Sequence, residues 1–141
     1  MKSTPLAKRV FNQMFDNDPF SQWLDIKCLE IEAGKCVLEM LVRPEMTNGF
    51  NVAHGGIAYS LADSALAFAS NSHGKCSVSI ETSISHTEPV HQGDVLTATV
   101  EEKRCSAKTG IYFITVTNQH GLEVALFKGI VYRTAKDWFT I

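Results

Sequence analysis

The stretch IAYSLADSALAFAS, residues 57–70, decides the fold class of this chain. It is rich in Ala and Leu, lacks proline, and places apolar side chains around nearly the whole circumference of a helix. A helix that is apolar on all sides is buried in a protein interior, so other elements must cover it. The segments His54-Gly55-Gly56 before it and Ser72-His73-Gly74 after it are expected to bound the helix.

The segment that follows this helix has the pattern of a strand. The even-numbered residues from 76 to 84 are Cys, Val, Ile, Thr and Ile, and the odd-numbered ones are Ser or Glu. This period of two is that of a strand, with the even positions on one face and Ser79 on the other. Three more strands are expected over about 95–103, 111–117 and 123–133, because turn-forming residues separate these stretches.

The N-terminal part predicts an amphipathic helix over residues 4–16, with Thr4 as its N-cap. Two strands are expected next, one that starts at Leu24 and one that ends before Pro44, and residues 45–53 are expected to form a loop. The order of helix, two strands, buried helix and four strands predicts an α+β domain over residues 1–141, an antiparallel sheet wrapped around one helix. One sheet covers only part of such a helix, so a partner subunit is expected to cover more.

Composition excludes several classes of function. The formal net charge of −2 comes from 13 basic and 15 acidic residues without a basic stripe, so nucleic acid is not an expected partner. No uninterrupted apolar run reaches the length of a membrane span, and the N-terminus lacks the apolar segment of a signal peptide. The four cysteines form no C-x-x-C pair, and we expect reduced, mostly buried thiols in a cytoplasmic protein.

Asp63 is the unusual residue of the central helix. It is the only Asp, Glu, Lys or Arg between Met46 and Gly74. A carboxylate within an apolar helix is costly to bury unless it is paired or hydrogen-bonded. It therefore either reaches solvent on a narrow polar stripe with Ser60 and Ser64, or serves as a catalytic carboxylate at a subunit junction.

The start of the helix is a second candidate for chemistry. Gly55 and Gly56 have no side chains, so a ligand can approach their backbone closely. The first amides of a helix lack an intrahelical acceptor and carry partial positive charge, so one of them can polarise a carbonyl group.

The segment NGFNVAHGG, residues 48–56, with Leu61-Ala62-Asp63 downstream, resembles the hotdog-fold acyl-CoA thioesterases, and most closely their PaaI-like branch. The similarity covers nearly the whole chain and includes Lys108-Thr109-Gly110 and residues 124–127. One difference is Asn51, where relatives often have glycine, and Asn tolerates the left-handed conformation. The resemblance implies a hotdog fold and hydrolysis of an aryl or short- to medium-chain acyl-CoA without a cofactor.

The resemblance also implies roles for particular residues. Asp63 corresponds to the general base or nucleophile, and Gly56, with Gly55 beside it, to the amide that polarises the thioester carbonyl. Asn48 corresponds to a side chain that orients the carbonyl or the water, His54 to a histidine that supports the loop, and Ser79 to a serine that helps to place the water. The site is expected to be composite, with the glycines of one subunit facing the carboxylate of another in a homodimer or homotetramer.

Lys103, Arg104 and Lys108 form the cluster of positive charge that could bind the phosphates of coenzyme A. Thr109 and Gly110 could add a hydroxyl group and an open backbone amide. Neighbouring residues of a strand point to opposite faces, so Lys103 and Arg104 should not both engage. An ordinary solvated turn explains the same residues.

Other chemistries have less support. His86 and His91 flank Pro89 in the manner of metal ligands, but further ligands are missing, so no metal is expected. A hotdog hydratase or dehydratase would need a histidine paired with an acidic residue, a role that the position of His54 does not fit. A non-catalytic acyl-CoA-binding protein is the remaining alternative.

Overall fold

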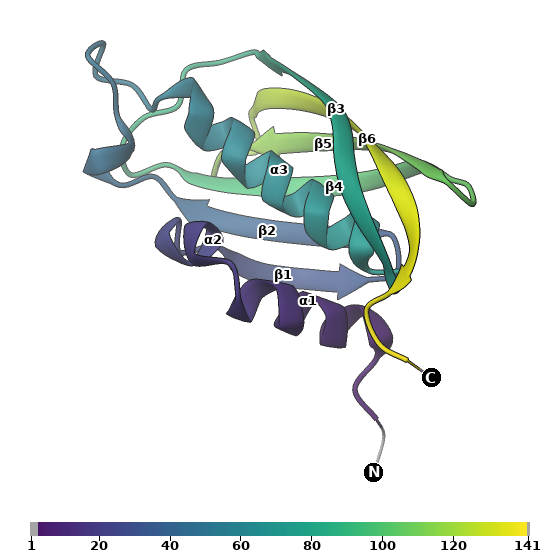
Figure 1. The fold of residues 1–141 in the computed structure, drawn as a ribbon. Coiled ribbons are helices and arrows are strands. Elements are labelled where there is room, and N and C mark those ends of the chain that lie inside the picture. The colour runs from purple at the N-terminus through teal and green to yellow at the C-terminus, as the bar shows by residue number, and fades with distance from the viewer. Residues whose placement is uncertain (1–2, 141) are drawn as a thin grey trace.

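The computed structural model describes residues 3–140. Their elements are shown in Figure 1. They are, in chain order, α1 (Leu6–Asp16), α2 (Pro19–Trp23), β1 (Lys27–Glu32), β2 (Lys35–Leu41), a 3-10 turn (Pro44–Met46), α3 (Gly55–Asn71), β3 (Lys75–His86), β4 (Val95–Cys105), β5 (Thr109–Thr117) and β6 (Glu123–Asp137).

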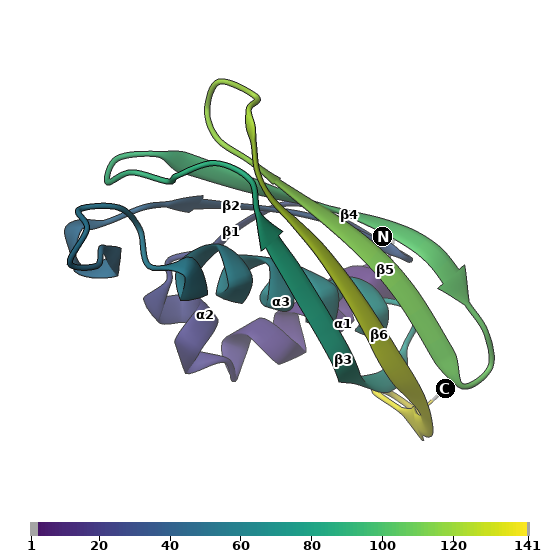
Figure 2. The ribbon, with the colours of Figure 1, turned by 90° about the horizontal axis from the view of Figure 1, so that it is seen from above.

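The strands form one sheet in the order β1-β2-β4-β5-β6-β3, and all neighbours are antiparallel. The sheet curves around α3 (Figures 1 and 2), which confirms the predicted α+β architecture. Gly129 of β6 allows close contact between the two layers. A Cβ atom at this position would lie 2.5 Å from Cδ2 of Leu66 on α3, a separation that side chains do not adopt.

The central helix is buried on several sides, as its composition predicts. Leu61, Ala62 and Ala65 have no exposed surface. Figure 2 shows α1 and α2 on the side of α3 that faces away from β2 and β4. The ring of Phe11 on α1 packs edge-on against Phe68 on α3, with 4.8 Å between their centroids.

The N-terminal elements differ from the prediction in two places. Helix α1 begins at Leu6 and its N-cap is Pro5, so the assignment of Thr4 as the cap was wrong. The short helix α2, which the sequence analysis did not predict, forms after α1 because the Asp18 carboxylate accepts the Ser21 backbone N–H at its start. This helix delays the next strand, which begins at Lys27 rather than near Leu24.

Strand β3 does not keep the strict alternation that its sequence predicts. Ser79 pairs with Val131 and Glu81 with Ile130, so a β-bulge inserts one extra residue between them. Before the bulge, Ser79 lines a cavity with α3, while Val78 is 56% exposed. Beyond it, even-numbered Ile84 packs on the core. The odd-numbered residues therefore face α3 before the bulge, and the even-numbered residues face the core after it.

Two further predictions concern the thiols and the membrane. All four cysteines are free, but only Cys36 is buried and Cys105 is exposed, so the expectation of mostly buried thiols was wrong. Among residues 3–140, none of the helices combines the length and apolarity needed to span a bilayer.

Candidate active site

Asp63 lies half-buried on α3 and borders two cavities. Within residues 3–140 its carboxylate forms neither a hydrogen bond nor a salt bridge, although burial raises its pKa above the usual value of 3.8. An aspartate without a local partner keeps both oxygens available and binds a proton more readily than an exposed one. Both features suit a group that takes a proton from water.

The two cavities beside Asp63 differ in size and lining. The larger, of about 220 Å³, lies toward α2 and is lined by Asp18, Phe20 and Ser21 together with residues of α3. The smaller, of about 70 Å³, lies toward the sheet and contains Ser79. Ser79, before the bulge in β3, therefore borders the same small cavity as Asp63.

Ser60 and Ser64 border the larger cavity with Asp63, so the polar stripe considered from the sequence is present. The hydroxyl group of Ser64 lies 2.9 Å from that of Ser21, which links α3 to α2. Solvent access along this stripe and a role for Asp63 in chemistry are therefore compatible.

The first turn of α3 holds the second half of the candidate site. His54 is the N-cap residue, and its Nδ1 accepts the Gly56 N–H at 2.9 Å. The His54 N–H donates to the carbonyl oxygen of Met46 at 2.8 Å, which ties the helix start to the preceding loop. The loop-supporting role that the resemblance implies for His54 agrees with both bonds.

These bonds change the assignment of the polarising amide. The Gly56 N–H is occupied by His54, whereas no acceptor within residues 3–140 takes the Gly55 N–H. An amide that already donates to a neutral ring nitrogen is a poor donor to a substrate carbonyl. Within residues 3–140 the Gly55 N–H, and not the Gly56 N–H expected from the resemblance, is therefore the amide left free at the helix start.

Asn48 serves the loop before α3. Its Oδ1 accepts the N–H of Phe50 at 2.9 Å and that of Val52 at 3.4 Å. Asn51 in the same loop has φ of +62°, the left-handed conformation that its tolerance predicts. Asn48 lines neither cavity that contains Asp63. A role in shaping the loop accounts for its side-chain oxygen without contact to a substrate.

The two halves of the site lie apart within one chain. Gly55 and Asp63 are separated by eight residues on α3, or about 12 Å along the helix axis at about 1.5 Å per residue. Gly55 borders a different cavity, of about 290 Å³, to which Asp63 does not contribute. One thioester carbonyl could not contact both groups of a single chain.

Comparison with known proteins identifies the family. Residues 50–125, more than half of the chain, match the model of the thioesterase superfamily. The chain belongs to this superfamily.

One relative, compared in sequence and in structure, refines this assignment. The chain is 38% identical to the acyl-coenzyme A thioesterase PaaI of Escherichia coli, over 85% of this chain and 86% of the relative. The structure of the E. coli PaaI protein superposes with a TM-score of 0.91 at 36% identity, over 93% of this chain and 95% of that one. The protein is therefore a PaaI-like thioester hydrolase with the hotdog fold.

A second relative was solved with a ligand. A Streptococcus mutans protein bound to acetyl CoA is 27% identical and has a TM-score of 0.77, with coverage of 79% of this chain and 90% of that one.

The structure divides the thioesterase's candidate coenzyme A residues into two groups. Arg104 and Lys108 are exposed, and neither forms a salt bridge with any residue from 3 to 140. Lys103 is less available, because its Nζ donates to Glu101 at 2.8 Å and lies 5.2 Å from the centroid of the Phe113 ring. A bulge between Glu102 and Arg104 disturbs the alternation of β4, so the expectation that Lys103 and Arg104 point to opposite faces was wrong.

Thr109 and Gly110 are part of the β4–β5 hairpin. The hydroxyl groups of Thr109 and Ser106 lie 2.9 Å apart. Gly110 is buried and pairs with both neighbouring strands, and a Cβ atom on it would lie 2.8 Å from Cε2 of Tyr112. The expectation of an open amide at Gly110 was therefore wrong, because the sheet uses this backbone.

One cluster of titratable groups lies outside the region that the sequence indicated. Ligand atoms of His73, Glu102 and Cys105 lie within 4.8 Å of one another. Glu102 already accepts a hydrogen bond from the Tyr112 hydroxyl at 2.7 Å and lies 2.6 Å from His73 Nε2. The cluster joins the end of α3 to β4 and β5, so His73 contacts the sheet in addition to lying in the segment that bounds the helix.

Proposed function

We propose that the chain hydrolyses an acyl-CoA thioester to a carboxylic acid and coenzyme A, with an aryl or a short- to medium-chain acyl group. The observation that carries this proposal is the half-buried Asp63, whose carboxylate has no partner within residues 3–140 and borders two cavities. The E. coli relative named as an acyl-coenzyme A thioesterase supports the choice of substrate class.

In the proposed mechanism Asp63 acts as a general base. It takes a proton from a water molecule as the water oxygen attacks the thioester carbon, and the electron pair of the C=O bond moves onto the oxygen. The Gly55 N–H stabilises that oxyanion. Collapse of the intermediate re-forms the C=O bond and breaks the C–S bond, and the electron pair of that bond leaves with the sulfur. The proton held by Asp63 passes to this thiolate, which leaves as coenzyme A and restores the carboxylate. No step uses a resident metal ion or prosthetic group.

The mechanism requires a second copy of the chain, because Gly55 and Asp63 are too far apart within one. We propose that β3 of two copies pair at the interface. This strand lies at the end of the sheet order, and Val78 and Ile80 on it are 56% and 63% exposed. A long strand with an open edge and exposed apolar residues is a template for pairing with another strand. The dimer would bring Gly55 of one copy to Asp63 of the other, and dimers could pair into tetramers.

The nucleotide end of the substrate is assigned to Arg104 and Lys108, the two basic residues of the hairpin without a salt bridge in the described chain. The S. mutans relative bound to acetyl CoA supports a coenzyme A site in this fold. The free thiols suit a reducing compartment, so we place the protein in the cytoplasm.

Release of free thiol from a panel of aryl and alkyl acyl-CoA thioesters tests the proposal. Hydrolysis of at least one member at a rate that depends on Asp63 is the expected result. Binding of acyl-CoA without turnover would indicate a non-catalytic binding protein, and water addition to an enoyl-CoA would indicate a hydratase. Either outcome would overturn the proposal.

A further inference from the structure

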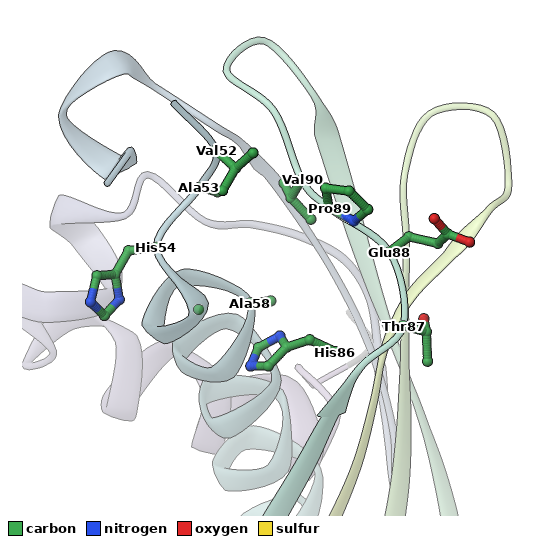
Figure 3. Close-up of a pocket in the computed structure, with 10 residues that line it drawn as sticks. Val52, Ala53, His54, Ala58, His86, Thr87, Glu88, Pro89 and Val90 are labelled. Atoms are coloured by element: carbon green, nitrogen blue, oxygen red, sulfur yellow. The ribbon is translucent and has the colours of Figure 1, made fainter. Parts of the chain in front are cut away.

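The cavity beside Gly55 contains a histidine that the proposed mechanism does not use. This cavity of about 290 Å³ lies between residues 52–55 of the loop that leads into α3 and residues 86–90 at the end of β3. Figure 3 shows His86 on the β3 side of this cavity, with its ring turned toward the first turns of α3.

His86 lies very close to the amide proposed to polarise the substrate. A Cβ atom built on Gly55 would lie 3.2 Å from His86 Nε2 and 3.5 Å from its Cε1. The absence of a side chain at Gly55 is thus what leaves room for the imidazole at the helix start. Within residues 3–140 no hydrogen bond is formed by the His86 ring, and no acceptor takes the Gly55 N–H. Two unused donors therefore border one cavity.

We propose that Nε2–H of His86 is a second hydrogen-bond donor to the thioester carbonyl oxygen, beside the N–H of Gly55. This inference rests on the proposed function and adds a residue to it. Negative charge on the carbonyl oxygen increases as water attacks. Two hydrogen-bond donors that the fold already places beside this oxygen therefore stabilise the transition state more than the bound substrate. His86 gives up no proton in this role, and Asp63 remains the base.

The other polar side chains of the cavity do not fit this role. His54 uses Nδ1 to cap α3, and its contact is with Gly56 rather than with Gly55. The Thr87 hydroxyl group already donates to the carbonyl oxygen of Glu123 at 2.7 Å. Glu88 is a carboxylate, which would repel a developing oxyanion instead of stabilising it. His91 offers a matched control, because it is an exposed histidine five residues from His86 and does not line the cavity.

Substitutions of His86 distinguish a hydrogen-bond donor from a side chain that only shapes the cavity. His86→Phe keeps a planar ring without the N–H, and His86→Gln places an amide N–H near the position of Nε2. We expect His86→Phe to lower kcat by about a hundredfold, the lower end of the effect of a lost oxyanion donor, with KM changed by less than about threefold. His86→Gln should recover most of the loss, and His91→Gln should match the wild type.

Two kinetic outcomes would overturn the inference. One is a His86→Phe variant with wild-type kcat, including the case in which only KM rises. The other is a His86→Gln variant as slow as His86→Phe. Thermal melting of each variant separates both outcomes from a failure to fold.

The infrared stretch of the substrate carbonyl provides a test without turnover. Phenylacetyl-CoA labelled with ¹³C at the thioester carbonyl is bound to Asp63→Asn, with and without His86→Phe. A donor at His86 should lower the stretching frequency relative to the double variant, whereas equal frequencies would overturn the inference. The proposed function fails separately, through the absence of thioester hydrolysis by the wild-type chain.

Discussion

The replacement Asp63→Asn separates the catalytic role of this residue from a structural one. The amide is nearly the same size as the carboxylate, and within residues 3–140 the carboxylate has no hydrogen-bond partner that the change could break. The variant should therefore fold and bind substrate, with KM within about threefold of wild type, while kcat falls by at least about a hundredfold, the usual contribution of a general base. Thiol release under saturating acyl-CoA measures kcat directly.

The same substitution should raise stability. Burial raises the pKa of Asp63 in the folded protein above 3.8. Between the unfolded and folded pKa values the folded state binds more protons, so stability falls as pH rises through that interval and remains lower above it. The amide side chain of the Asp63→Asn variant carries no charge and avoids this cost, so the melting temperature of the variant at pH 7 should exceed that of wild type. At pH values below the unfolded pKa the difference should shrink.

The raised pKa also sets the direction of the pH profile. Only the ionised carboxylate can accept a proton, so kcat/KM of the wild type should decline as pH falls through a pKa higher than that of an exposed aspartate. A folded Asp63→Asn variant that keeps most of its activity would refute the assignment of the base. An inactive Asp63→Asn variant that is less stable than wild type would show that the carboxylate makes a stabilising contact, and would refute the claim that it has no partner.

Three further predictions concern binding of the coenzyme A phosphates, formation of the dimer, and a mechanism without a metal ion. Replacing Arg104 and Lys108 together with Ala should raise KM for acyl-CoA several-fold, equivalent to about 1 kcal/mol, and leave kcat unchanged. Lys103→Ala should have a smaller effect because Glu101 already holds this side chain, and equal losses on acyl-pantetheine without phosphates would instead indicate a structural role. Ile80→Lys should place a charge on the exposed edge of β3 and weaken the dimer, so light scattering should report smaller particles and activity should fall on dilution. An active, stable wild-type monomer would contradict the composite site. Dialysis against EDTA should leave kcat unchanged, and a loss of activity that zinc restores would contradict a mechanism without a metal ion.

The sequence by itself determined the central helix and its one carboxylate. Burial of residues 57–70 follows from local composition, because a helix that is apolar all round has no face to expose to water. Asp63 is identifiable from the same local composition, because a single charged residue in an apolar helix is costly to bury and needs a physical explanation. Alternation and turn residues were likewise enough to predict that the later strands exist and roughly where they lie, because these patterns depend on neighbouring positions.

Only the tertiary structure decided which polar groups are available for chemistry. The bulge in β3 turns Ser79 toward α3, and its position depends on pairing with β6, which lies far along the chain. Gly55 and Gly56 are indistinguishable as glycines, and the cap formed by His54 separates the free amide from the occupied one. His86 reaches Gly55 because β3 ends beside the start of α3. Local patterns determine which faces of an element are apolar, whereas hydrogen-bond partners and distances between elements depend on register and packing.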